Sequence, residues 1–478
     1  MTPWAVLALI LAVALGLRLW LAHSTHLWFD ELYTLWIARL PFADLLRAVA
    51  GDIHPPLHYA LEWAWRRLGG DGDLWIKSLS IVTGLANVAL MVVLGRDLFG
   101  RREGVLAAAL LAVHPAHVAF SQEARSYALL FLALTFATWR GWRWLGGGRR
   151  ADGVAYAVAA AVALYTHYLA APVLAFVALA GVVALRRAPG RLMAWIGWHA
   201  LAALLFAPQV PTVLLQLQRL NGDHWVKPPT LGALFNVVRL LSLGPKYLVP
   251  PLALAALLPL LRARQRPAAA FLWMTSLVPM LVLWGLAMRG AGVFVERYMF
   301  FTLPAWCVLI AAGIVGLSPL PLRAGAALVV LASALRALVL REPQVEARHL
   351  TEVERWLSPR VAAGDVVVHA DAHSLVFARH YALDAGRHVL LLATPRLPYY
   401  EGDLIIPREW RVDTAFVDSL ARGGTRWWAV SYRAGYAGAD VAAARLARAA
   451  RDTTLALPRA TVWRGGAPDT APRPGSSR

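Results

Sequence analysis

The 478-residue chain contains very little cysteine and few charged side chains for its length. Its one cysteine, Cys307, stands inside an apolar run, so neither an intramolecular disulfide nor a thiolate metal cluster can form within it. Charged residues make up 16% of the sequence, while 59% is apolar and the mean hydropathy is +0.54. Because soluble domains average about 45–50% apolar and about 25% charged residues, the composition indicates a membrane protein.

The net charge of the chain does not require a nucleic-acid partner. The formal charge of +19 comes largely from arginine, and many of these arginines stand in short connections between apolar runs. Short cytoplasmic loops of membrane proteins are enriched in Arg and Lys. We therefore interpret the charge as a topology signal and expect no nucleic acid among the partners, which should include membrane lipids.

Apolar runs recur at about the 20-residue length that crosses a bilayer. They predict about eleven transmembrane helices in residues 1–341, so we expect this part to be an all-α polytopic membrane domain. The first run is too long for the core of a signal peptide and lacks a basic start, which favours a retained span. The predicted spans are 3–22, 74–98, 104–120, 123–142, 153–166, 168–186, 192–210, 247–261, 268–287, 299–317 and 322–340.

Arginine clusters occur in every second connection, at 96–102, 140–150, 186–191 and 262–266, and Arg323 stands in the next. The excess of positive residues assigns these connections to the cytoplasm. The other connections then lie outside the cytoplasm, and they hold most of the acids and histidines. These outer connections are residues 23–73, the turns near 121 and 167, residues 211–246 and residues 288–298.

Residues 342–466 differ in composition from the spans before them. Strand-like patterns occur at 364–369, 388–393 and 426–431, and they alternate with helical patterns at 346–358, 373–383 and 438–451. We expect a small α/β domain, which an odd number of spans places outside the cytoplasm. Residues 467–478 are rich in Pro, Gly and Ser, so we expect a disordered tail.

The first outer loop, residues 23–73, contains adjacent acids near its start. Asp30 and Glu31 open a segment with apolar residues at helical spacing that ends near Arg39. Helix capping and the helix dipole are enough to explain acids at this place. A carboxylate at the mouth of a partly apolar cavity is also suited to general-base catalysis, because desolvation raises its pKa. Both interpretations stay open at this point.

The same loop contains Asp52 and His54 directly before two prolines. Pro55 and Pro56 stiffen the turn, and residues two apart on an extended chain point to the same side. A rigid loop with solvated polar side chains would have the same sequence. Two such elements in one outer loop favour an active site more strongly than either element does alone.

Together with motifs further along, these two elements resemble a known family. The resemblance is to the GT-C fold glycosyltransferases, and within them to bacterial family 39-like enzymes related to protein O-mannosyltransferases and to lipid A aminoarabinose transferase. It extends over the membrane part to about residue 340. The segments that carry it are Trp28–Tyr33, Asp52–Tyr59, Ser121–Tyr127, Leu164–Tyr168, Trp225–Pro229 and Glu296–Tyr298 followed by Pro304.

The resemblance implies an enzyme of the bacterial inner membrane that acts on the extracytoplasmic side. Such enzymes transfer a sugar from a polyprenyl-phosphate donor to an acceptor hydroxyl, with inversion at the anomeric carbon. It implies that residues 23–73 are catalytic, with Asp30 as the general base and Glu31 and Asp52 orienting the acceptor or the sugar. The acceptor is a lipid, a glycan or a protein. A protein acceptor has no support from the sequence, because no loop is long enough to hold the large domain inserted in eukaryotic mannosyltransferases.

The leaving group of such a reaction is a lipid phosphate, so cations should bind it near the membrane surface. Arg125 and Arg297 fall at outer span ends, where guanidinium groups can hold phosphate oxygens. Most arginines at span ends, however, simply extend to the interface. The remaining substrate-binding residues that we predict are His54, Gln122, Tyr127, His167, Lys227 and Tyr298, although an interfacial histidine, a solvated lysine and an aromatic belt account for several of them.

Two further questions stay open at the level of sequence. The outer loops hold several histidines beside acids, which suit Zn²⁺ or Mn²⁺ by type, but their spacing supports no site, so we predict no metal and no cofactor. A transporter or lipid flippase is the rival class of protein. Such proteins carry ionisable residues or broken helices near the midplane and often inverted repeats, whereas here the acids gather at one face and no repeat is visible. A non-enzymatic scaffold would leave the loop acids unexplained.

Overall fold

The computed structural model describes residues 2–23, 25–220, 226, 228–290, 292–341, 345–394, 397, 402–432 and 437–466. The chain divides into two compact units, Met1–Ser24 with Ala38–Pro343 and Thr25–Ile37 with Gln344–Arg478. The observed division therefore differs from the predicted one, 1–341 and 342–466, by the segment Thr25–Ile37. Helix α2 (Phe29–Arg39) belongs to both units, since the division falls between Ile37 and Ala38. The tail predicted to be disordered, 467–478, lies outside the described residues.

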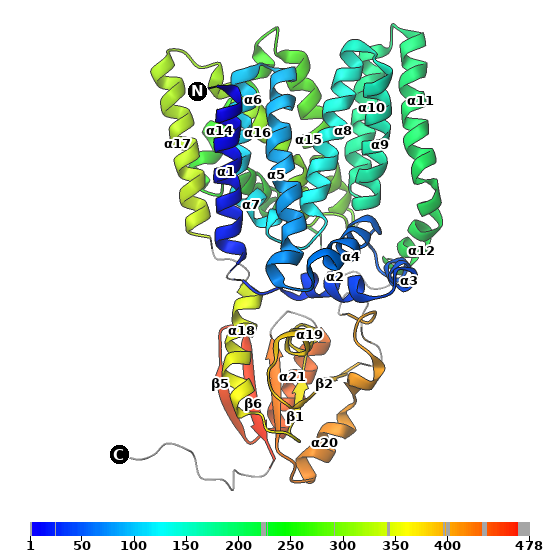
Figure 1. The fold of residues 1–478 in the computed structure, drawn as a ribbon, viewed down its shortest axis with the longest axis vertical. Helices are drawn as coiled ribbons and strands as arrows, with labels where there is room; N and C mark the ends of the chain where they lie inside the picture. The colour runs from blue at the N-terminus through cyan, green and yellow to red at the C-terminus, as the bar shows by residue number, and fades with distance from the viewer. Residues whose placement is uncertain are drawn as a thin grey trace. The chain divides into compact units, whose positions relative to one another are not determined.

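The first unit is a bundle of helices (Figure 1). Long helices lie side by side in it, and short helices α3, α4 and α12 lie near one end. Its helices are α1 (Pro3–Ala22), α3 (Phe42–Gly51), α4 (Leu57–Gly69), α5 (Asp73–Leu98), α6 (Arg101–Val113), α7 (Pro115–Ser121), α8 (Tyr127–Gly147), α9 (Arg150–Thr166), α10 (Ala170–Leu185), α11 (Pro189–Phe206), α12 (Val210–Leu220), α13 (Leu231–Leu241), α14 (Val249–Leu261), α15 (Arg266–Ala287), α16 (Leu303–Val315) and α17 (Leu320–Val339).

Fewer helices are long and apolar enough to cross a membrane than the sequence pattern predicted. Among the described residues there are 6, or up to 8 if each bent pair is one span. The predicted spans at 153–166 and 168–186 correspond to α9 and α10, of 17 and 16 residues. At a rise of about 1.5 Å per residue, such helices are shorter than a hydrocarbon core of about 30 Å. The chain is a multi-pass membrane protein, and a count of eleven spans is not established.

One predicted span, 104–120, is broken in the structure. Helices α6 and α7 meet at His114–Pro115 with a bend of 64°. Proline has no N–H to continue the helical ladder, and it disfavours a helical conformation at the residue before it. His114 lies in the break and compensates for it: its Nδ1 accepts a hydrogen bond from the Ala116 N–H at 3.2 Å, and its Nε2 lies 3.1 Å from the Leu241 carbonyl oxygen.

Small residues allow the helices of the bundle to approach closely. A Cβ atom added at Gly95 of α5 would lie 2.5 Å from the Gly104 Cα of α6, so the two backbones are almost in contact. A Cβ atom at Gly313 of α16 would lie 1.9 Å from the Ala255 carbonyl oxygen of α14. Packing through small residues is typical of membrane helices, where van der Waals contact drives association.

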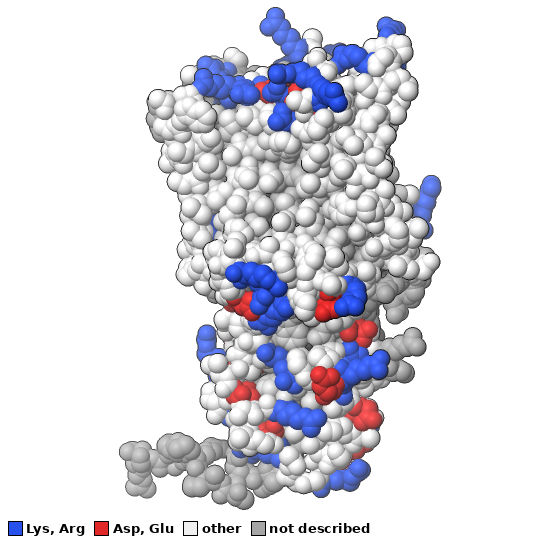
Figure 2. All heavy atoms as spheres, turned by 45° about the vertical axis from the view of Figure 1, so that its right-hand side comes forward, with Lys and Arg blue, Asp and Glu red and all other residues white. Residues whose placement is uncertain are grey.

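The arginine-rich connections gather at one end of the bundle. They join α5 to α6, α8 to α9, α10 to α11 and α14 to α15, and Figure 1 shows these turns at the same end. Figure 2 shows Lys and Arg crowded at that end, next to a broad band of helix surface with almost no charge. This separation is what a bundle embedded in a bilayer requires.

The second unit contains a six-stranded sheet with strand order β3-β2-β1-β4-β6-β5. β3, β2, β1 and β4 are parallel, while β6 is antiparallel to β4 and β5. Helix α19 connects β1 to β2, and α20 connects β3 to β4. The elements are α18 (Val345–Leu357), β1 (Val366–His369), α19 (Ala372–Tyr381), β2 (Arg387–Leu391), β3 (Arg411–Val412), α20 (Thr414–Arg422), β4 (Trp427–Tyr432), α21 (Ala437–Ala449), β5 (Asp452–Ala456) and β6 (Ala460–Gly465).

Apolar side chains on one face of this sheet pack against α20 and α21. Val368 of β1 and Ala429 of β4 belong to this core, together with Val417 of α20 and Leu446 of α21. Residues alternate between the two faces of a strand, so Trp428 points to the opposite face, where its ring lies 6.0 Å from the Trp356 ring of α18. Helices therefore cover both faces, as in doubly wound α/β folds.

Candidate active site

The connection between α3 and α4 brings three polar side chains together in the first unit. His54 Nδ1 lies 2.9 Å from Asp52 Oδ2, and the Tyr59 hydroxyl donates a hydrogen bond to the same oxygen at 3.0 Å. Pro56 stands directly before α4, and the first turn of that helix directs Tyr59 back towards the carboxylate. The predicted proximity of Asp52 and His54 is therefore present, while Tyr59 was not predicted as a site residue.

Asp52 is a buried carboxylate that stays charged. Burial alone would raise its pKa, but the charge and hydrogen bond of His54, a backbone hydrogen bond and the Arg125 charge together lower the pKa below its usual value. Burial raises the pKa of the Tyr59 phenol, and the Asp52 charge raises it further. Tyr59 thus remains a hydrogen-bond donor to an ionised carboxylate.

Arg125, in the turn between α7 and α8, and His167, directly after α9, lie close to these three side chains. The Arg125 carbonyl accepts a hydrogen bond from Ser80 Oγ of α5 at 3.3 Å, which ties the α7–α8 turn to the bundle. His167 follows α9, and its ring centroid lies 5.9 Å from that of His54. A small pocket between these elements is lined by His54, Pro55, His58, Tyr59, Arg125, Ser126 and Thr166.

His167 is neutral, and one of its ring nitrogens has no hydrogen-bond partner among the described residues. Burial, reinforced by the positive charges of His54, Arg125 and Arg297, lowers its pKa to about 3. Its Nδ1 accepts a hydrogen bond from the Leu169 N–H at 3.2 Å, so the proton of the neutral ring is on Nε2. Nε2 is buried and has no hydrogen-bond partner in the described part of the chain.

The 3₁₀ helix Glu296–Thr302 contributes Arg297 and Tyr298 from a distant part of the sequence. The Tyr298 ring lies 5.3 Å from His167 and 6.3 Å from Tyr127, and the Arg297 guanidinium lies 5.5 Å from the Tyr298 ring. Arg297 is also close enough to lower the pKa of His167. Seven of the predicted site residues therefore meet in the first unit: Asp52, His54, Arg125, Tyr127, His167, Arg297 and Tyr298.

One predicted substrate-binding residue, Gln122, has its polar contacts elsewhere in the first unit. Gln122 uses its Nε2 to bind the carbonyls of Leu17 and Arg18 at 3.3 and 2.8 Å, and its Oε1 accepts from Arg341 at 3.4 Å. It joins the ends of α1 and α7 rather than facing the pocket. Lys227 lies outside the described residues.

His58 and Glu62 are polar residues that sequence analysis did not select. They stand four residues apart on α4, both are buried, and His58 Nε2 lies 3.9 Å from Glu62 Oε1. Burial, together with the charges of Arg125 and His54, lowers the pKa of His58 to about 3. The signal available in the sequence was the i,i+4 spacing on a helix after the proline pair.

Asp30 and Glu31 belong to the second unit, in the first turn of α2. Glu31 is buried, and its Oε2 accepts a hydrogen bond from the Trp28 N–H at 3.2 Å, as the acidic residue of a capping box does. Asp30 is half-buried, and its charge helps raise the pKa of His373. Glu31 thus caps the helix.

No group of three or more His, Cys, Asp or Glu side chains among the described residues has the arrangement of a metal site. His54, His58 and His167 do gather near Asp52, but Asp52 already accepts from His54 and Tyr59. The geometry of the described residues thus adds no support for a divalent cation.

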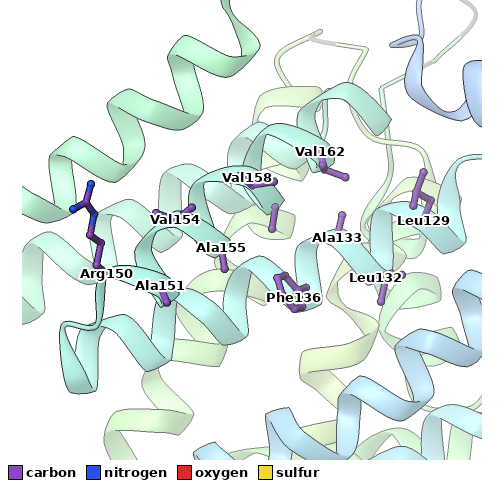
Figure 3. Close-up of a pocket in the computed structure, with 11 residues that line it drawn as sticks. Leu129, Leu132, Ala133, Phe136, Arg150, Ala151, Val154, Ala155, Val158 and Val162 are labelled. Atoms are coloured by element: carbon purple, nitrogen blue, oxygen red, sulfur yellow. The ribbon is translucent and has the colours of Figure 1, made fainter.

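A long apolar groove runs along helices α8 and α9. Its volume is about 870 Å³, and its lining consists almost wholly of Leu, Ala, Val and Phe side chains. Figure 3 shows Leu129 and Val162 at one end of the groove and Arg150 and Ala151 at the other. Leu129 stands near the start of α8 and Val162 near the end of α9, so this end of the groove is at the same end of the two helices as Tyr127 and His167.

Comparisons with known proteins agree on the fold. Residues 53–211 match the family model of dolichyl-phosphate-mannose-protein mannosyltransferases. This range includes His54, Arg125 and His167 but neither Asp30 nor Asp52. No curated protein matches the sequence of this chain.

Among solved structures, the chain is similar to ArnT from Cupriavidus metallidurans in the apo state, with 16% identity, a TM-score of 0.66 and coverage of 96% of this chain and 97% of that one. It is similar to the same protein bound to undecaprenyl phosphate, with 15% identity, a TM-score of 0.65 and coverage of 97% and 98%. It is also similar to the Archaeoglobus fulgidus oligosaccharyltransferase tethered to an acceptor peptide, with 11% identity, a TM-score of 0.52 and coverage of 93% and 71%.

At these identities the solved structures establish the fold, and the family match adds the enzyme class. Both agree with the resemblance found in the sequence motifs. The chain is therefore a membrane glycosyltransferase of the GT-C fold, with the match to the dolichyl-phosphate-mannose-protein mannosyltransferase family in residues 53–211.

Proposed function

We propose that this protein transfers a sugar from a polyprenyl-phosphate donor to an acceptor hydroxyl, with inversion at the anomeric carbon. Asp30 is the general base, and Arg125 and Arg297 bind the phosphate. The observation that carries the proposal is the convergence of two guanidinium groups on His167, whose buried Nε2–H has no protein partner among the described residues. Two cations and one neutral N–H donor form a set suited to phosphate oxygens.

The chemical step needs only a base and anion stabilisation. The acceptor oxygen attacks the anomeric carbon and forms the new glycosidic bond, while its proton passes to the Asp30 carboxylate. The bond from the anomeric carbon to the phosphate oxygen breaks, and its electron pair leaves with the lipid phosphate. Arg125 and Arg297 stabilise the charge that develops on that phosphate, an effect that is large when the donors are held in place beforehand.

Asp52 supports this step in a second way. It is ionised and bound by His54 and Tyr59, so a sugar or acceptor hydroxyl can donate to its remaining lone pairs. We propose that Asp52 orients a hydroxyl of the sugar or the acceptor, and that Glu31 acts indirectly by capping α2. The Asp52 carboxylate already accepts from His54 and Tyr59, so we assign hydroxyl orientation to Asp52 and proton abstraction to Asp30.

A polyprenyl donor suits the apolar surface of the bundle. The groove on α8 and α9 is lined mostly by aliphatic side chains along its length (Figure 3). The matched family model is that of enzymes named for a dolichyl-phosphate donor, and the similar ArnT structure holds undecaprenyl phosphate. These likenesses support a lipid-phosphate sugar as donor.

We further propose that the reaction takes place on the extracytoplasmic side of a bacterial inner membrane. The arginine-rich connections gather at one end of the bundle, and the polar cluster is built from connections that alternate with them along the chain. By the positive-inside rule the arginine-rich end is cytoplasmic. The acceptor is a lipid, glycan or protein that presents a hydroxyl group there.

The experiment that tests this function measures transfer of the sugar and the configuration of the product. The purified protein in nanodiscs is incubated with a polyprenyl-phosphate sugar and acceptor lipids, and the anomeric configuration of the product is read by NMR. The proposal expects loss of sugar from the donor and a product of inverted configuration. Retention of configuration would contradict a single displacement with Asp30 as base.

A further inference from the structure

The parallel part of the sheet in the second unit has the topology of a ligand-binding fold. β1 lies between β2 and β4, and the chain leaves β1 towards β2 and β3 before α20 returns it to β4 on the other side. The direction of winding therefore reverses between β1 and β4. In open α/β sheets, ligands bind outside the carboxyl ends of the strands at this switch point.

One carboxylate joins the two strands at the switch point. Asp371 follows β1, and its Oδ2 accepts a hydrogen bond from the Tyr432 N–H at the end of β4 at 2.6 Å. Its Oδ1 accepts from the Ser374 N–H at 2.8 Å and so caps α19. These bonds fix the start of α19, and with it the position of His373, beside the carboxyl ends of both strands.

A segment of the chain itself occupies the surroundings of His373. The Phe29 ring stacks on the His373 ring with centroids 4.0 Å apart and an interplanar angle of 17°. The Phe29 N–H donates to Glu346 Oε1 at 3.2 Å, and His373 Nδ1 lies 2.8 Å from that same oxygen. The Leu27 N–H donates to the Tyr381 hydroxyl at 2.8 Å. Residues 27–29 are thus held by α18 and α19, the two helices beside the switch point.

The contact between Glu346 and His373 favours the protonated form of the histidine. Burial lowers the pKa of His373, but the Glu346 charge and hydrogen bond and the charges of Asp371 and Asp30 outweigh it, so the pKa is raised. His373 is buried and Glu346 is partly buried, and both contact Phe29, the residue before Asp30. A displacement of Phe29 would therefore move the Asp30 carboxylate, because α2 begins at Phe29.

We propose that the surface formed by α18 and α19 beside the switch point is the docking site for the segment Thr25–Ile37, and that Glu346 and His373 are positioning residues for Asp30. The inference rests on the proposed function, in which Asp30 is the general base. It gives the C-terminal unit a role in catalysis, since the base is held by α18 and α19.

The test uses the full-length protein in nanodiscs with two readouts. Glu346→Ala removes the acceptor for the Phe29 N–H, whereas Glu346→Gln keeps an oxygen at that place. Glu352→Ala on the same helix is the matched control, because Glu352 is exposed. The first readout is amide hydrogen exchange of residues 27–32 against that of β1. The second is kcat and the donor KM for sugar transfer.

We expect Glu346→Ala to raise exchange in residues 27–32 and leave β1 protected. We expect kcat to fall about 10- to 100-fold with the donor KM within about twofold, as misplacement of a catalytic group predicts. Glu346→Gln should stay within about threefold of the wild type, and Glu352→Ala should match it. His373→Phe, which keeps a ring against Phe29, should retain more activity than His373→Ala.

The outcomes separate the inference from the proposed function. Unchanged exchange in residues 27–32 of a folded Glu346→Ala protein would overturn the docking site. Raised exchange with unchanged kcat would overturn the positioning role. If Asp30→Asn kept full activity, the general-base proposal would fail, while the exchange measurement would still decide whether the segment is docked. Equal losses in His373→Phe and His373→Ala would show that the stacked ring does not position the segment.

Discussion

The hydrogen bond from Tyr59 to Asp52 gives a quantitative prediction for the polar cluster of the first unit. Both side chains are buried, and the hydroxyl donates to a charged oxygen at 3.0 Å. Hydrogen bonds to charged groups contribute about 1.5–3 kcal/mol, so Tyr59→Phe should lower the free energy of unfolding by about 2 kcal/mol. The substitution removes one oxygen atom and leaves no cavity the size of a side chain, so packing adds little to this value.

The matched control is Tyr165→Phe, because the Tyr165 hydroxyl donates to the Leu205 carbonyl at an exposed position. Its removal should cost less than about 0.5 kcal/mol. Unfolding in mixed detergent micelles, followed by tryptophan fluorescence, compares the two variants with the wild type. A double-mutant cycle with Asp52→Asn should give a coupling energy of about 1 kcal/mol or more. Equal stability of the two Phe variants, or additive effects in the cycle, would refute the reasoning.

Two further predictions concern the donor site and helix packing. Arg297→Ala should raise the donor KM about tenfold or more, because a charged contact to the phosphate is lost, and should leave the acceptor KM unchanged. Replacement of the exposed Arg289 by Ala should change neither KM, and a change confined to the acceptor KM of Arg297→Ala would place the phosphate elsewhere. Gly181→Ala should destabilise the protein by about 1–3 kcal/mol, because the new Cβ would clash with the Trp195 indole. Gly197→Ala, where a Cβ would have nothing within 4 Å, should melt like the wild type, and equal melting of both variants would contradict the observed helix contact.

The sequence predicted those parts of the site that depend on contacts between residues close together in the chain. The spacing of Asp52 and His54 before two prolines implied that they lie together, and their side chains are 2.9 Å apart. The strand-like patterns near 366, 388 and 427 correspond to β1, β2 and β4. Arginine clusters indicated which connections share one end of the bundle, because charge is excluded from the hydrocarbon layer whatever the tertiary packing.

What could not be predicted depends on contacts between distant segments. Tyr59 reaches Asp52 only because α4 begins directly after the prolines, and nothing in the sequence fixes that direction. The assignment of Thr25–Ile37 to the second unit depends on Glu346 and His373, which stand more than three hundred residues further along the chain. Span counting failed to anticipate the break at His114–Pro115, because hydropathy averages over a bend.

Gln122 shows what a motif leaves open. It stands within one of the segments that carry the resemblance, and its amide binds the backbone carbonyls of Leu17 and Arg18 in α1. The sequence could suggest a polar role for this residue, but the backbone groups that it contacts belong to a distant segment and could be seen only in the structure.

The measurement that tests the central claim most directly compares the wild type with Asp30→Asn on a panel of radiolabelled polyprenyl-phosphate sugars in nanodiscs. The account predicts that the wild type releases sugar from at least one donor to an acceptor. It predicts that Asp30→Asn, folded and inserted like the wild type, is slower by about 10²- to 10⁴-fold, the usual contribution of general-base catalysis. Activity of Asp30→Asn equal to that of the wild type would contradict Asp30 as the base, and a folded wild type that consumes no donor of the panel would contradict the proposed donor class.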